Sequence, residues 1–256
     1  MGPKLKQPFD SPLVDSFLAS YPPVPYRIRF LDHCVRYFPR RFFKFLSPHN
    51  QDKFVSHALF FSRPLTSADR YPETSPCVVG VADKGIVQRL IDHPEGFRAD
   101  MYWTRFNRGD TCYYLLHDGE IKCYQWVNSS FCSIYCGHES EVIFHHLREH
   151  QAYTYDFYTY SDFRGQGYGK ILKHHVWADL HNRKVVRCYS GIHPDNFVSL
   201  KIHLAGGFKL ECPYYLYRVM SWTLAVRGTQ KQTLAIANWL DSLTLESSPQ
   251  PDQQSA

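Results

Sequence analysis

The sequence contains no apolar run long enough to cross a membrane. None of its stretches approaches the ~20 apolar residues that a transmembrane helix needs. Residues 1–6, Met-Gly-Pro-Lys-Leu-Lys, lack the apolar core of a signal peptide and the Ser or Thr that a myristoylation signal places at position six. We therefore expect a cytoplasmic protein.

The sequence also has little net charge and no clustered set of cysteines. The net charge of +5 fits an anionic ligand, but without a localised basic patch it is too small to indicate nucleic-acid binding. The eight cysteines are dispersed, several of them within strand-like runs, which is typical of reduced and mostly buried thiols. Aromatic residues make up 16% of the chain, which predicts a core rich in tyrosine and phenylalanine.

One group of Cys and His residues raises the alternative of a zinc site. Cys132, Cys136 and His138 are followed by His145 and His146. The spacing is not that of a standard zinc finger, and the cysteines lie in or beside a strand-like run. We therefore expect no metal.

The first 74 residues differ in composition from the rest of the chain. They are rich in proline and predicted to be irregular, and residues 26–46 interleave arginines with aromatic residues. One interpretation is a helical cap whose arginines face water. The alternative is a basic-aromatic surface for an acidic partner, a carrier protein or a membrane face. We divide the chain into an N-terminal extension (1–74), a main domain (75–226), and a C-terminal helix with a disordered tail (227–256).

The main domain shows a regular alternation of strand-like and helical runs, broken by an ambiguous polar connector at 139–149. Their order, β-α-α-β-β-β-α-β-α-β-β, predicts a mixed α/β domain with an antiparallel front half and a later crossover helix. The strand-like runs are 77–81, 111–117, 121–128, 152–160, 185–192, 208–212 and 214–222, and the helical runs are 84–92, 95–108, 171–181 and 196–204.

A glycine-rich turn at 162–170 separates a predicted strand from a helix. It would expose backbone N–H groups and the positive end of the helix dipole, which suits a phosphate. A Walker loop is excluded because Ile171 follows the Gly-Lys pair. A dinucleotide fingerprint is excluded by the spacing of Gly165, Gly167 and Gly169. The remaining alternative is an ordinary connection whose glycines only permit a tight turn.

Two segments resemble the GNAT superfamily of acyl-CoA-dependent N-acyltransferases. Residues 164–169, Arg-Gly-Gln-Gly-Tyr-Gly, resemble the family's pyrophosphate loop, and residues 196–208 resemble its Asn-helix-Gly-Phe segment after the fifth strand. The order of elements is also similar to that of the family over 75–226. The resemblance implies a GNAT-like fold, with a mixed central sheet and flanking helices, to which the N-terminal extension is added.

The resemblance further implies that acetyl-CoA is a co-substrate. Backbone N–H groups of the loop would hold the pyrophosphate, and residues of a splayed strand would pair with the pantetheine arm and polarise the thioester carbonyl. The residues implied in binding are Phe157, Tyr158, Thr159, Arg164, Gly165, Gln166, Gly167, Tyr168, Gly169, Lys170, Asn196 and Ser199.

Acyl transfer to an amine requires a neutral amine, whose ordinary pKa of ~10.4 calls for a general base. The first candidate for this base is Asp156. The alternative is that Asp156 is only a surface or salt-bridged carboxylate. Glu139 and Glu141 are weaker candidates. His203 occupies the position where many family members carry the tyrosine that protonates the leaving thiolate. Histidine can donate near neutral pH, or it is a helix-face residue without a role.

The leading prediction is an N-acetyltransferase that moves an acetyl group from acetyl-CoA to a primary amine by direct attack in a ternary complex. One alternative is a longer donor on CoA or on an acyl-carrier protein that docks on 26–46. Another is a CoA-binding regulatory module without turnover. The sequence does not identify the acceptor, and the oligomeric state is open, with a homodimer as one alternative. The acceptor pocket, or simply the core, is formed by Tyr102, Trp103, Tyr113, Tyr124 and Trp126.

Overall fold

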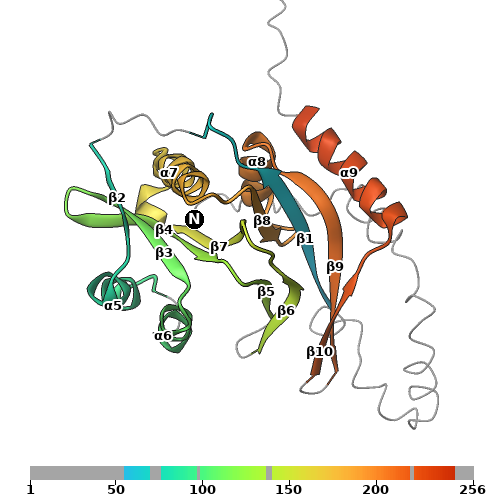
Figure 1. The fold of residues 1–256 in the computed structure, drawn as a ribbon, viewed down its shortest axis with the longest axis horizontal. Coiled ribbons are helices and arrows are strands. Elements are labelled where there is room, and N and C mark those ends of the chain that lie inside the picture. The colour runs from blue at the N-terminus through green and yellow to red at the C-terminus, as the bar shows by residue number, and fades with distance from the viewer. Residues whose placement is uncertain (1–54, 70–75, 97–98, 137–139, 220–221, 246–256) are drawn as a thin grey trace, which may run out of the picture. The chain divides into compact units, whose positions relative to one another are not determined.

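The computed structural model describes residues 55–69, 76–96, 99–136, 140–219 and 222–245 (Figure 1). Within these residues the chain forms ten strands, five α-helices and one short 3₁₀ helix. In chain order they are β1 (Val55–Pro64), β2 (Val78–Val81), α5 (Lys84–Asp92), α6 (Ala99–Arg108), β3 (Thr111–His117), β4 (Glu120–Asn128), β5 (Phe131–Cys136), β6 (Ser140–His146), β7 (Gln151–Thr159), η2 (Ser161–Phe163), α7 (Tyr168–Asn182), β8 (Arg187–Ile192), α8 (Phe197–Ala205), β9 (Lys209–Val219), β10 (Trp222–Arg227) and α9 (Gln230–Leu245).

Eight strands form one sheet in the order β10-β9-β1-β8-β7-β4-β3-β2, and β5 pairs with β6 in a separate hairpin. Neighbours in the large sheet are antiparallel except β7 and β8, which are parallel. Parallel neighbours need a crossover connection, and α7 supplies it. In Figure 1, α5 and α6 lie on one face of the β3–β4–β7 region and α7 lies on the other. The predicted mixed α/β fold is confirmed.

Local sequence signals explain several boundaries. Asp118 (φ 53°) and Gly119 (φ 77°) form the tight turn between β3 and β4, because both tolerate the left-handed conformation that such a hairpin requires. The side chain of Asp83 caps α5 by accepting from the Ile86 amide at 2.8 Å. These elements coincide with the hairpin and the first helix predicted from sequence.

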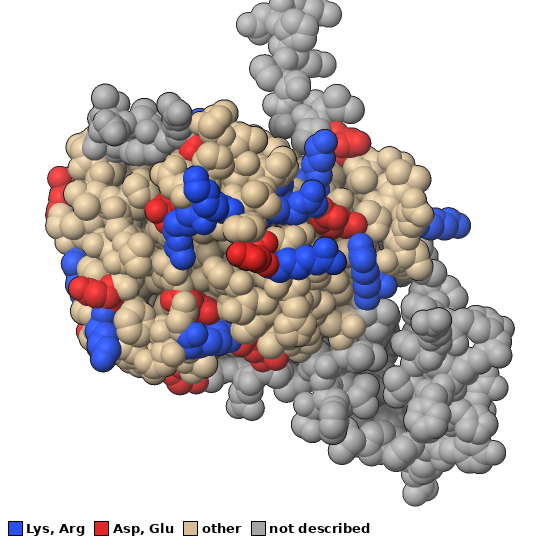
Figure 2. Space-filling model, viewed as in Figure 1, with Lys and Arg blue, Asp and Glu red and all other residues tan. Residues whose placement is uncertain are grey.

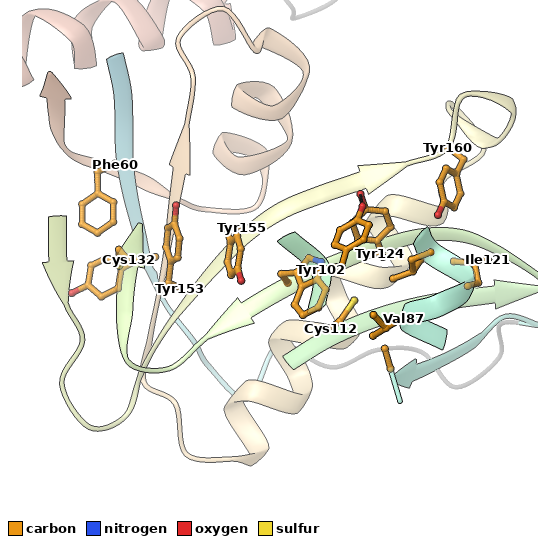
Figure 3. Close-up of a cluster of buried hydrophobic side chains, with 14 of the residues drawn as sticks. Phe60, Val87, Tyr102, Cys112, Ile121, Tyr124, Cys132, Tyr153, Tyr155 and Tyr160 are labelled. Carbon is orange, nitrogen blue, oxygen red and sulfur yellow. Dashed lines mark hydrogen bonds between the residues drawn. The ribbon is translucent and has the colours of Figure 1, made fainter. Parts of the chain in front are cut away.

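The core is rich in tyrosine, as the composition predicts. A band of aromatic side chains runs from Phe60 through Tyr153 and Tyr155 to Tyr102 and Tyr124 (Figure 3). The rings of Tyr153 and Tyr155 are stacked with centroids 5.4 Å apart. The hydroxyls of Tyr102 and Tyr124 lie 2.6 Å apart, so each buried polar tip has a partner.

Strand β1 corrects the prediction that all of residues 1–74 are irregular. It lies between β8 and β9 in the interior of the sheet, and its residues 58–61 are buried. A strand covered on both faces shows a continuous apolar run instead of an alternating pattern. That run, Ala-Leu-Phe-Phe, is short and flanked by polar residues, so the sequence pattern did not reveal it.

Two further segments differ from the prediction. The connector at 139–149 contains β6, which pairs with β5, and neither strand alternates clearly enough to be recognised alone. The runs at 208–212 and 214–222 are largely one strand, β9, which continues through Pro213. The register with β1 shifts close to this point: Phe60 pairs with Cys212 and Phe61 with Leu210, so Glu211 is an extra, bulged residue of β9.

Other predictions lie outside the described residues, namely the cap or docking surface at 26–46 and the tail at 246–256. On the face shown in Figure 2, basic and acidic side chains are interspersed. Among the helices that the structure describes, none combines the length and apolar character needed to span a bilayer.

Candidate active site

Strands β7 and β8 separate part-way along their length. Their pairing ends at Thr154 and Ser190, although β7 continues to Thr159 and β8 to Ile192. We call this separation the fork, with Thr154 and Ser190 at its vertex. Beyond the vertex, the β8-facing edge of β7 has no strand partner among the described residues, so its backbone groups can pair with a ligand.

A bulge in β7 lies just beyond the vertex. The pairing with β4 shifts by one residue, so that Asp156 and Phe157 together face Gln125. Asp156 has a φ of 45°, in the left-handed region that costs a non-glycine residue about 1 kcal/mol. Because bulges re-aim backbone groups, the amides at this point are candidates to donate to a carbonyl oxygen in the fork.

The glycine-rich turn forms the N-terminus of α7. Gly165 (φ 78°) and Gly167 (φ 84°) are left-handed, and a Cβ added to either would meet open space. Gly167 is the N-cap and provides no side-chain hydrogen bond to the helix. Within the described part of the chain, the amides of 165–169 have no hydrogen-bond acceptor. This cradle of uncompensated amides fits an anion such as a pyrophosphate.

Close packing holds the turn against β7. A Cβ on Gly169 would lie only 2.6 Å from Cζ of Phe157, so glycine is required where helix and strand meet. Arg164 donates from Nε to the Thr159 carbonyl at 3.0 Å and from Nη2 to the Tyr158 hydroxyl at 3.1 Å. Its side chain therefore fastens the turn to the end of the strand.

Glu95 is a site residue that the sequence analysis missed. It accepts a hydrogen bond from the Tyr158 hydroxyl at 2.7 Å and from the Ser161 amide at 3.1 Å. Hydrogen bonds from Ser161 and Tyr158 lower the pKa of Glu95 below its usual value. Glu95 thus links the chain between α5 and α6 to the segment that leads into the turn. The local sequence does not predict this contact, because the partners of Glu95 lie more than sixty positions away in the chain.

Glu95 also borders a cavity of about 260 Å³. Glu120 and Asp162 contribute two further carboxylates to its lining, and Arg89 contributes a positive charge. The cavity lies where α5, β4 and the segment after β7 meet.

Asp156 forms an ion pair with Arg105, whose side chain is 2% exposed. The Arg105 guanidinium also lies over the ring of Tyr155, at 4.9 Å from its centroid. The carboxylate thus has the salt-bridged environment that was the alternative to a catalytic base. Glu141, a weaker candidate, pairs with Arg108 and accepts from Ser133, and Glu139 lies outside the described residues.

His203 is buried behind the vertex of the fork. Its Nδ1 lies 2.7 Å from the Ser199 carbonyl, and its Nε2 lies 3.1 Å from Ser190 Oγ and 3.2 Å from Lys173 Nζ. Burial, reinforced by the charge of Lys173, holds the pKa of His203 well below its usual value. His203 is therefore neutral at physiological pH.

The remaining sequence candidates fall into two groups. Asn196, which follows β8 in the chain, caps the N-terminus of α8 by accepting a hydrogen bond from the Ser199 amide at 3.1 Å. Of the five aromatic residues considered for an acceptor pocket, four are fully buried and belong to the core; Trp103 alone of these is partly exposed. In the part of the chain that is described, no group of His, Cys, Asp or Glu has the arrangement of a metal site.

A sequence model of the acetyltransferase (GNAT) family matches residues 86–208. The match begins in α5 and ends just after α8, and it includes the fork and the turn. This part of the chain belongs to the GNAT family.

Solved structures with a similar arrangement have low sequence identity. A putative GNAT acetyltransferase from Novosphingobium aromaticivorans is 14% identical, with a TM-score of 0.46, over 68% of this chain and 66% of its own. The ribosomal-protein-S18-alanine N-acetyltransferase of Escherichia coli is 12% identical, with a TM-score of 0.41, over 52% of this chain and 77% of its own. An aminoglycoside N-acetyltransferase in complex with CoA is 16% identical, with a TM-score of 0.41, over 60% of this chain and 97% of its own.

The chain spans less than two thirds of the length of the first two similar structures, 66% and 50%. No curated protein sequence matches it.

Proposed function

We propose that this protein is an N-acetyltransferase that transfers an acetyl group from acetyl-CoA to a primary amine by direct attack in a ternary complex. The observation that carries the proposal is the adjacency of two features. The fork leaves one edge of β7 open, and the uncapped turn at the start of α7 follows that same strand. A single extended ligand with a phosphate group and an amide-bearing arm would bind the turn with its phosphate and the open edge of β7 with its arm.

The donor end is proposed to be held mainly by backbone groups. The amides of 165–169 would bind the pyrophosphate, because they point from a helix N-terminus and lack other acceptors. Backbone groups of Phe157 and Thr159 would pair with the pantetheine arm along the open edge. The amide nitrogen of Asn196 is not engaged by its capping bond, which uses the oxygen, and would contact the same arm.

At the reacting end, the chain has to hold the thioester carbonyl and accept a proton. Amides at the bulge would donate to the carbonyl oxygen as negative charge develops there. Asp156, the nearest carboxylate, would accept the proton of the attacking amine, directly or through water. Its ion pair with Arg105 fixes the carboxylate at the bulge.

The acceptor is proposed to approach from the cavity beside Glu95. Of its three carboxylates, Glu120 is paired with Lys122, and Glu95 and Asp162 remain beside the single guanidinium of Arg89. A cationic amine would be attracted to this lining before it loses its proton.

A second candidate function is a CoA-binding module without turnover. The pairing of Asp156 with a buried arginine favours this candidate, because the guanidinium already occupies a carboxylate oxygen that the attacking amine would need to reach.

The test is a screen of primary amines with acetyl-CoA and with longer acyl-CoAs, read by release of the CoA thiol. We expect thiol release with acetyl-CoA that depends on the amine, together with a CoA-induced rise in melting temperature. A thermal shift without thiol release would favour the second candidate. The absence of both thiol release and a thermal shift would contradict both candidate functions.

A further inference from the structure

Lys173 occupies a position on α7 that the fold otherwise reserves for apolar residues. The buried face of the helix consists of Leu172, Lys173, Val176, Trp177 and Leu180. The Lys173 side chain is 1% exposed. Lysine is rarely buried so completely, because removing its charge from water is costly unless a counter-ion is present.

No carboxylate compensates this charge within the described residues. The Lys173 ammonium lies 3.2 Å from Nε2 of His203 and 4.4 Å from the centroid of the Phe157 ring. The other titratable groups that act on it are the thiols of Cys188 on β8 and Cys123 on β4. Burial lowers the pKa of Lys173 to about 8, so the side chain is still mostly cationic at neutral pH.

The hydrogen bonds around His203 define which of its ring nitrogens accepts a hydrogen bond from Lys173. We assign the hydrogen of His203 to Nδ1, because the Ser199 carbonyl 2.7 Å away can only accept. Its Nε2 is then an acceptor that faces Lys173. The Ser190 hydroxyl can donate to the Thr154 carbonyl at 3.2 Å, which leaves Nε2 to the ammonium. His203 therefore orients Lys173 without neutralising it.

This cation lies beside the fork. Ser190, whose hydroxyl lies 3.1 Å from His203 Nε2 and donates to the Thr154 carbonyl, forms with Thr154 the last pair of the two strands. Phe157, whose ring contacts the ammonium, is part of the bulge beyond them. A thioester held along the open edge of β7 would place its sulfur close to this vertex.

We propose that Lys173, oriented by His203, is a buried cation that stabilises the negative charge formed on the CoA sulfur. The inference rests on the proposed function. As the amine nitrogen bonds to the carbonyl carbon, the carbon–sulfur bond breaks and its electron pair stays on the sulfur. The amine proton passes to Asp156, and CoA departs as a thiolate. The uncompensated ammonium receives its counter-ion at that moment, so the interaction is stronger in the transition state than in the resting protein.

The decisive measurement is the pKa of the CoA thiol bound to the protein, followed by the ultraviolet absorbance of the thiolate. In the wild type we expect this pKa to lie about 1 unit or more below that of free CoA. In Lys173→Met, which fills the same space without charge, the difference disappears. Lys201→Met, which removes an exposed lysine from α8, serves as the matched control and leaves the bound thiol unchanged.

Activity and stability distinguish this role from a structural one. Lys173→Met is expected to lower kcat about 10- to 100-fold with little change in KM for acetyl-CoA, and to remove the loss of rate above pH about 8. Its melting temperature stays equal or rises, because a buried uncompensated charge is gone.

Three results would overturn the inference: a bound thiol that titrates as free CoA does in the wild type, an unchanged kcat in Lys173→Met, or a loss of activity that only follows a loss of folded protein. The titration of the bound CoA thiol in the wild type needs no variant, so it tests the inference even if Lys173→Met does not fold. If the wild type binds CoA but transfers no acyl group, the proposed function fails while the titration still tests the cation. If it does not bind CoA, both fail.

Discussion

Gly167→Ala separates the ligand-binding role of the turn from its folding role. Gly167 has a φ of 84°, and an added Cβ meets no heavy atom within 4 Å. The folded protein therefore bears only backbone strain, about 1–2 kcal/mol. Gly119, in the β3–β4 hairpin, has a φ of 77° and equally open surroundings, so Gly119→Ala is a matched control. We expect both variants to lose similar amounts of unfolding free energy.

Only Gly167→Ala places a methyl group where the phosphates would approach the amides of α7. Losing one hydrogen bond to a charged phosphate weakens binding by about 1.5–3 kcal/mol, which is roughly 10- to 100-fold in the dissociation constant for CoA. Calorimetric titration with CoA and thermal unfolding of both variants provide the two measurements. An unchanged CoA affinity in Gly167→Ala, or an equal loss in Gly119→Ala, would refute the assignment of the turn as the pyrophosphate site.

Three further predictions concern titratable residues. Glu95→Gln is expected to weaken CoA binding several-fold because Glu95 anchors Tyr158 and Ser161. Gln88→Ala, on the exposed side of α5, is the control. Equal CoA affinities of the two variants would contradict the anchoring role. Asp156→Asn is expected to lower kcat/KM by about 100-fold or more and to destabilise the fold by about 3 kcal/mol, since the ion pair with the buried Arg105 is lost. Thiol-release kinetics that match the wild type would exclude Asp156 as the base. Because the pKa of His203 is lowered in the folded state, the unfolded chain binds the proton first, and stability falls as the pH drops below about 6.5. Chemical unfolding of His203→Gln across that range is expected to lack this slope, and a persisting slope would assign it to other groups.

The corrections to the predicted fold share one physical cause. β1 is a strand because β8 and β9 satisfy its backbone on both edges, and Pro213 of β9 pairs with Leu59 of β1 beside a bulge at Glu211. Each depends on a partner strand that is distant in the sequence. The hairpin at Asp118-Gly119 and the capped helix at Asp83, by contrast, depend on residues within one turn of the chain. Such local signals can be recognised from the sequence alone.

The sequence by itself determined the glycine-rich turn, the helix that follows it and the Asn196 cap, and with them the donor end of the proposed reaction. These features are local, because left-handed glycines and capping side chains act within a few residues. Only the tertiary structure decided the environments of the charged groups. Asp156 meets Arg105, Glu95 meets Ser161, and Lys173 meets His203 across thirty or more positions. The protonation of such groups depends on burial and on partners, and both arise only when the sheet and its helices pack together.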